Sequence, residues 1–177
     1  MQLEKFVKEL DINFKNTFDE NSINQIINSV KENRTLINNL DLPDTFGIYV
    51  FFLKREINFN TFQELETIWK EEGISNIPKA IKSRFDKCKL ENGFYPFYIG
   101  KSEHLSTRVD EHLNHHKTHS TYGMKLKTRT NFKIEDFYVG HWCLENMPTI
   151  SQAVKQFIIT TIEQKVREKL NPLIGKK

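Results

Sequence analysis

Two short runs rich in β-branched and aromatic residues constrain the fold most strongly. They read FGIYVFFL at residues 46–53 and GFYPFYIG at residues 93–100. Their length and composition are typical of buried β-strands. A third run, NFKIEDFYVGHW at residues 131–142, is also strand-like, although its polar and apolar residues alternate less regularly. Strands of this kind must cover their apolar faces with other elements, and the rest of the chain predicts helices for that purpose.

Apolar residues recur at helical spacing before, between and after these strands. Residues 1–42 predict an N-terminal helical extension. Residues 58–92 predict a helical insertion between the first two strands, in which a capping box at Thr61 and Glu64 opens one helix and Pro78 opens another that ends near Gly93. A last helix is predicted from about residue 150 to 170, stopped by Pro172. Its inward-facing residues would be Val154, Phe157, Ile158, Ile162 and Val166.

Length and charge set limits on the class of protein. A chain of 177 residues suits one domain with one core, so residues 1–177 are treated as a single unit. No apolar run approaches bilayer length, the N-terminus resembles no signal peptide, and the two cysteines have no zinc-ribbon spacing, so we expect a cytoplasmic protein with no membrane partner. The net charge is only +3, but residues 78–89 and 122–133 are rich in lysine and arginine and are candidate phosphate-facing segments.

The helix predicted after Gly100 places two polar side chains on one face. Arg108 and His112 are four residues apart, beside an apolar stripe that includes Val109, so we expect them where the core meets solvent. Glu163 has a similar border position on the last helix. Together with Tyr49, Tyr98 and Lys101, these three residues form a set that suits phosphodiester hydrolysis. Phosphodiester hydrolysis needs an activated water, a cation near the phosphate and a route for protons, and a lone carboxylate suits a Mg²⁺ that keeps several of its waters.

Each of these residues also has an ordinary interpretation. The tyrosines could be packed strand residues, Arg108 could pair with Asp110 or Glu111, and Glu163 could pair with Arg167 on one helix face. The histidine pairs at helical metal-ligand spacing, His112 with His116 and His115 with His119, leave a zinc site conceivable, although neither a cysteine nor a nearby acid completes a tetrahedral set.

The order of the polar residues resembles a known family. GIY at residues 47–49, YIG at residues 98–100, an arginine eight residues beyond Gly100, a glutamate in a late helix and a proline nine residues after it resemble the GIY-YIG nuclease family. The stretch YIGKSEHLSTR is especially similar. The resemblance covers residues 46–53 and 94–177, and leaves the N-terminal extension and the insertion at residues 58–92 unexplained.

The resemblance implies an α+β fold, an α/β sandwich in which a small three-stranded antiparallel sheet is flanked by helices. It implies an endonuclease that cuts DNA with one Mg²⁺ or Mn²⁺ ion, with Glu163 as the metal ligand and Arg108 as the cation on the scissile phosphate. By the same resemblance, Tyr49 would orient or deprotonate the attacking water, Tyr98 would assist at the phosphate, and Lys101 would lower a tyrosine pKa or touch phosphate. The histidine at position 112 favours the restriction and homing groups of the family.

Two features depart from the family pattern. The insertion is longer than usual between the two tripeptides and is a candidate for target recognition. The family tends to have an asparagine twelve residues after the glutamate, where this chain has Gly175, with Asn171 nearby. A structure-specific repair nuclease and a non-cleaving DNA-binding module therefore remain alternatives. A homodimer is a further expectation, because one active site cuts one strand at a time. The nuclease hypothesis requires that the side chains of Tyr49, Tyr98, Arg108, His112 and Glu163 converge in one solvent-open hollow.

Overall fold

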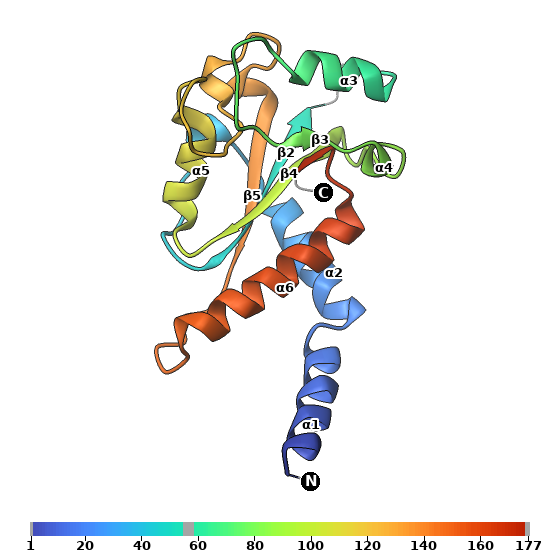
Figure 1. Cartoon of the computed structure of the whole chain (residues 1–177), viewed down its shortest axis with the longest axis vertical. Helices are drawn as coiled ribbons and strands as arrows, with labels where there is room; N and C mark the ends of the chain where they lie inside the picture. Colours follow the sequence, from blue (N-terminus) through green and yellow to red (C-terminus); the bar gives the residue numbers. More distant parts are fainter. Residues whose placement is uncertain (1, 55–58, 176–177) are drawn as a thin grey trace.

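The computed structural model describes residues 2–54 and 59–175, and in these residues the chain has a mixed α+β fold (Figure 1). The elements follow in the order α1 (Gln2–Thr17), α2 (Glu20–Glu32), β1 (Thr35–Leu36), η1 (Ile37–Asn39), β2 (Gly47–Lys54), α3 (Phe62–Trp69), β3 (Lys79–Ala80), α4 (Lys82–Phe85), β4 (Phe94–Ser102), α5 (Leu105–Asn114), η2 (Leu126–Thr128), η3 (Ile134–Asp136), β5 (Phe137–Cys143), α6 (Gln152–Leu170) and β6 (Ile174–Gly175). None of the helices in this described part is both long and apolar enough to pass through a bilayer.

The main sheet contains the three predicted strands and one more. β2 lies in the centre and pairs antiparallel with β4 on one side and β5 on the other, and the full order is β1-β5-β2-β4. The predicted count of three strands is therefore corrected to four within the described residues. The extra strand, β1, is two residues long and lies in the segment for which the sequence predicted helix. The segment is a strand because it pairs antiparallel with β5.

Side chains of β2 alternate between two apolar layers. Ile48, Val50 and Phe52 pack with α2 and α6, whereas Tyr49 and Phe51 face the layer formed by α5, the insertion and the loop before β5. This alternation is the two-residue period of a strand, and both faces of β2 are buried because it is the central strand. β4 is the edge strand of the described sheet, so elements from both layers can reach it. That edge is where the candidate site lies.

The insertion is only partly helical. α3 begins at the predicted capping box of Thr61 and Glu64. The second predicted helix, from Pro78 to near Gly93, is present only as the four-residue helix α4, and strand β3 takes the place of its start. The reason is tertiary, because β3 pairs antiparallel with β6 at the C-terminus in a separate two-stranded sheet. Asn58, the first residue of the predicted insertion, lies outside the described residues.

The two ends of α6 have different surroundings. The helix begins after the cap residue Ser151, close to the predicted start, and its C-terminal half is buried on the sheet. The prediction that Val154 and Phe157 face inward is wrong, since they are 46% and 57% exposed. The N-terminal half of α6, which contains both residues, extends beyond the sheet (Figure 1). There Phe157 lies against Phe14 of α1, with ring centroids 5.7 Å apart. α1 buries none of its residues and projects away from the sheet (Figure 1).

Candidate active site

The pairing of β2 with β4 brings the two predicted tyrosines together. Tyr49 lies opposite Gly100, Tyr98 lies opposite Phe51, and the tyrosine ring centroids are 6.3 Å apart. A Cβ atom at position 100 would lie 2.2 Å from the hydroxyl oxygen of Tyr49. Glycine at this position therefore allows the Tyr49 ring to cross β4 and reach the edge of the sheet.

Helix α5 positions Arg108 next to the tyrosines. The helix follows β4 directly, and its buried residues Leu105 and Val109 hold it against the sheet. Arg108 is partly buried, forms an ion pair with Glu111, and donates a hydrogen bond from Nη2 to the carbonyl oxygen of Tyr122 at 2.8 Å. The Glu111 pair is the ordinary partner expected on a helix surface. The hydrogen bond to Tyr122 was not expected from the sequence, and it orients the guanidinium toward the loop that follows α5.

His112 lies deeper than predicted. We expected it at the border of core and solvent, but it is fully buried, behind Tyr49. The reason is the loop that follows α5, which folds over this face of the helix: the backbone N–H of Met124 donates to Nδ1 of His112 at 3.1 Å. The other nitrogen, Nε2, lies 2.8 Å from the Tyr49 hydroxyl oxygen.

These contacts determine the protonation of His112. Burial lowers the pKa of His112 well below its usual value of 6.5, and the charge of Arg108 lowers it further. The ring is therefore neutral near pH 7, and because Nδ1 accepts a hydrogen bond, the single ring proton is on Nε2. His112 thus donates a hydrogen bond to the oxygen of Tyr49 and accepts none from it.

Both tyrosine hydroxyls are protonated near neutral pH. Burial raises the pKa of Tyr49 well above 10, the neighbouring Tyr98 raises it further, and Arg108 opposes the shift. Burial likewise raises the pKa of Tyr98 to about 12. Arg108 is the cation that lowers the pKa of both phenols. The two hydroxyls are thus proton donors in the free protein.

Helix α6 supplies the carboxylate. Glu163 is only 7% exposed and follows the buried residue Ile162, at the border of the helix face that covers the sheet. Its Oε1 lies 3.1 Å from Nη1 of Arg167, one turn further along the helix. The i,i+4 pair that the sequence allowed is therefore present. The carboxylate nevertheless faces a pocket rather than the core.

Five of the six predicted site residues line this one pocket, which has a volume of about 300 Å³. His112 is the exception: it lies behind the lining, hydrogen-bonded to Tyr49 and with its ring centroid 4.8 Å from that of Tyr98. Glu163 is the only acidic side chain among the lining residues, which also carry four cationic side chains. The residues that line the pocket are Tyr49, Arg84, Tyr98, Ile99, Gly100, Lys101, Arg108, Tyr122, Glu163, Arg167, Ile174 and Gly175. The pocket is thus suited to an anion.

The donor atoms fit a hydrated metal ion better than an ion enclosed by protein ligands. Among residues 2–54 and 59–175, no three histidine, cysteine, aspartate or glutamate side chains are placed to hold one ion. A zinc site built from the histidines that follow residue 111 therefore gains no support. The single carboxylate of Glu163 suits Mg²⁺, which keeps several waters, provided that the ion displaces Arg167 from that carboxylate.

Three pocket residues were not among the predicted site residues. Arg84 comes from the insertion, Arg167 from α6, and Tyr122 from the loop after α5. The sequence carried a partial signal for the first two, since Arg84 lies in a lysine-rich segment and Arg167 is four residues after Glu163. Tyr122 begins the other lysine- and arginine-rich segment, but nothing in that segment indicated the tyrosine itself as a site residue. Its place depends on the path of a loop without regular structure.

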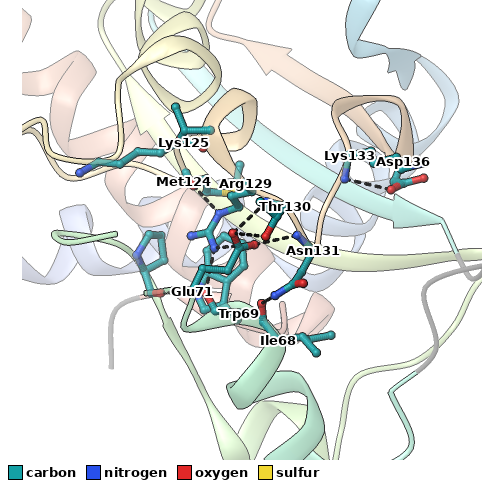
Figure 2. Close-up of polar contacts among 12 residues, drawn as sticks. Ile68, Trp69, Glu71, Met124, Lys125, Arg129, Thr130, Asn131, Lys133 and Asp136 are labelled. Carbon is teal, nitrogen blue, oxygen red and sulfur yellow. Dashed lines mark hydrogen bonds and ion pairs between the residues drawn. The ribbon is translucent and has the colours of Figure 1, made fainter. Parts of the chain in front are cut away.

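Buried charges tie that loop to the insertion, as Figure 2 shows. The side chain of Arg129 is fully buried, donates from Nε to the carbonyl of Met124 and from Nη1 to that of Trp69, both at 2.8 Å, and lies 3.4 Å from the centroid of the Trp69 ring. The carboxylate of Glu71 accepts from the backbone N–H groups of Thr130 at 2.8 Å and Asn131 at 3.0 Å.

Lys125 strengthens the same connection. Its ammonium group donates to the carbonyls of Ser75 and His119, both at 2.6 Å. The expectation that residues 122–133 face phosphate is therefore wrong for Lys125 and Arg129, whose side chains point inward to backbone carbonyls. Because the loop also holds Arg108 and His112, the insertion supports the candidate site through hydrogen-bonded backbone.

Comparison with known proteins identifies no relative. Neither a family model, nor a curated protein, nor a solved structure matches this chain. The geometry of the pocket and the residues in it are therefore the basis for a function.

Proposed function

We propose that the protein is a divalent-metal-dependent DNA endonuclease of the GIY-YIG type, with a restriction or homing-like role. One observation carries the proposal: Tyr49, Tyr98, Lys101, Arg108 and Glu163, which come from β2, β4, α5 and α6, line the same cation-rich pocket. A chance set of surface residues would not be expected to meet in this way. On this proposal the partner is DNA, the protein acts in the cytoplasm, and a homodimer would supply an active site for each strand.

The proposed roles follow from the charges. Glu163 would hold Mg²⁺ or Mn²⁺, and the ion when bound would neutralise charge on the phosphate and supply an activated water. Arg108 would contact the phosphate oxygens with its guanidinium fork, while its contact with Tyr122 keeps it oriented. Lys101 would add a second positive charge at the phosphate. The protonated Tyr98 hydroxyl would donate a hydrogen bond to a phosphate oxygen.

The contacts of Tyr49 favour orienting the attacking water over deprotonating it in the free protein. Its pKa is raised well above 10, so the hydroxyl keeps its proton. The hydrogen bond from Nε2 of His112 occupies one lone pair of the Tyr49 oxygen and would stabilise a phenolate if one formed. His112 is thus a positioning residue in this proposal, since it acts through Tyr49.

The test is nicking of supercoiled plasmid with and without Mg²⁺. We expect nicking that depends on the metal, and we expect Glu163→Gln to lose it while retaining its fold and its DNA binding. Glu168→Gln is the matched control, because Glu168 is exposed on the same helix and is not among the residues that line the pocket. Cleavage retained by Glu163→Gln at the wild-type rate would rule out the proposed metal ligand. Discrete bands would indicate sequence recognition, and preference for branched substrates would indicate a repair nuclease.

One observation favours a second candidate, a DNA-binding module that does not cleave. The 3.1 Å ion pair between Arg167 and Glu163 competes with a metal for the same carboxylate. Plasmid binding without nicking in either Mg²⁺ or Mn²⁺ would support this candidate. An Arg167→Ala variant that gains nicking would indicate that the ion pair alone keeps the metal out.

A further inference from the structure

The insertion reaches the candidate active site through α4. The backbone N–H of Ile81 donates to the carbonyl of Leu173 at 3.0 Å, and the N–H of Leu173 donates to the carbonyl of Pro96 on β4 at 3.1 Å. The short strand β3 pairs with β6 in the same region. This chain of backbone contacts links the insertion, the C-terminal segment and the edge strand. It places Arg84, the third residue of α4, in the wall of the pocket.

The surroundings of Arg84 favour an anionic ligand. Burial lowers the pKa of Arg84, and the positive charge of Arg167 lowers it further, by more than the negative charge of Glu163 raises it. The guanidinium groups of Arg84 and Arg167 thus repel each other in a pocket wall whose lining includes four cationic side chains and a single carboxylate, that of Glu163. The energy of such an arrangement falls when a phosphate brings additional negative charge between the cations.

The absence of a side chain at position 175 gives the guanidinium its place. A Cβ atom there would lie 2.8 Å from Nη1 of Arg84. The arginine thus lies close against the backbone of β6, in space that a larger residue at position 175 would occupy. Arg84 therefore comes from α4 in the insertion, while the space for its guanidinium is left by Gly175 of β6, which is distant in sequence.

We propose that Arg84 is a second phosphate-binding arginine, which contacts the DNA backbone in this pocket together with Arg108. The inference rests on the proposed function and deepens it, because it makes the insertion a contributor to the active site in addition to any part in target recognition. The planar guanidinium offers paired donors that match two oxygens of one phosphate.

The experiment measures binding of a labelled DNA duplex by fluorescence anisotropy over a series of KCl concentrations, in EDTA so that no cleavage occurs. We expect Arg84→Gln to weaken binding about tenfold or more. We also expect the slope of log Kd against log[KCl] to fall by about 0.9, the change for one lost phosphate contact. Arg84→Lys should keep most of the slope, since it keeps the charge. Lys87→Gln is the control, because Lys87 is exposed on the same insertion and lines no part of the pocket.

The outcomes separate this inference from the proposed function. An Arg84→Gln protein that is folded by circular dichroism and has the wild-type slope overturns the inference, as does a Lys87→Gln protein that loses as much slope. Wild-type protein that binds DNA but never nicks it overturns the proposed cleavage, while the slope still decides the role of Arg84. A wild-type protein that binds no duplex overturns both.

Discussion

Replacing Arg129 tests whether the buried contacts between the insertion and the loop after α5 stabilise the fold. Methionine is a suitable substitute because it fills much of the space of the arginine stem but removes the charge and every donor. The change leaves the carbonyls of Met124 and Trp69 without their 2.8 Å donors, and removes a cation 3.4 Å from the Trp69 ring centroid.

The expected loss of stability follows from these contacts. A hydrogen bond from a charged donor contributes about 1.5–3 kcal/mol, and two of them are lost. Breaking a buried charged cluster by removing one member typically costs about 3–5 kcal/mol. Glu71 reduces the penalty, because its carboxylate stays hydrogen-bonded to the backbone of Thr130 and Asn131. We therefore expect Arg129→Met to lose about 3–5 kcal/mol, a large part of the roughly 5–15 kcal/mol of a typical domain.

Urea unfolding followed by circular dichroism measures this loss. Lys127→Met is the matched control, since Lys127 is exposed two residues earlier in the same loop, and it should change stability by no more than about 0.5 kcal/mol. The reasoning is refuted if Arg129→Met loses less than about 1 kcal/mol, below the usual cost of a buried unpaired polar group. A result equal to that of the control would refute it too.

Three further predictions concern the candidate site. Below about pH 6.5 the free energy of unfolding should rise with pH, with a contribution of up to ~1.4 kcal/mol per pH unit from His112, because the unfolded state binds a proton on this ring and the native state does not. His112→Gln should reduce this slope in urea titrations from pH 5 to 7, whereas an unchanged slope would contradict the buried neutral ring. His141, whose pKa is also lowered by burial, contributes in the same direction, so His141→Gln should be measured beside it. Gly100→Ala should cost about 1–3 kcal/mol in thermal unfolding, because its Cβ would lie 2.2 Å from the Tyr49 hydroxyl; a stability within error of wild type would count against the close approach. Tyr49→Phe should slow single-turnover cleavage about 10²- to 10⁴-fold while leaving DNA affinity unchanged, and cleavage at the wild-type rate would exclude Tyr49 from the chemistry.

The sequence by itself determined the class of fold and its main elements. The strands containing Tyr49 and Tyr98 were predicted because their apolar and aromatic runs are local signals, and so was α6 with the proline that follows it. The order of the site residues along the chain, through its resemblance to the GIY-YIG family, also predicted that they meet, and five of the six line one pocket. Local patterns suffice for the strands and for α6, because strand composition and helix periodicity are set by neighbours in the sequence.

Only the tertiary structure decided where the polar residues face. Lys125 and Arg129, in the loop after α5, point inward because backbone carbonyls of the insertion and of the loop itself accept hydrogen bonds from them. His112 is buried because that same loop folds over α5. Strand β3 replaces a predicted helix because β6, nearly a hundred residues later, offers a partner, and this pairing brings Arg84 into the pocket. Such outcomes depend on contacts between segments that are remote in sequence, and no local pattern encodes them.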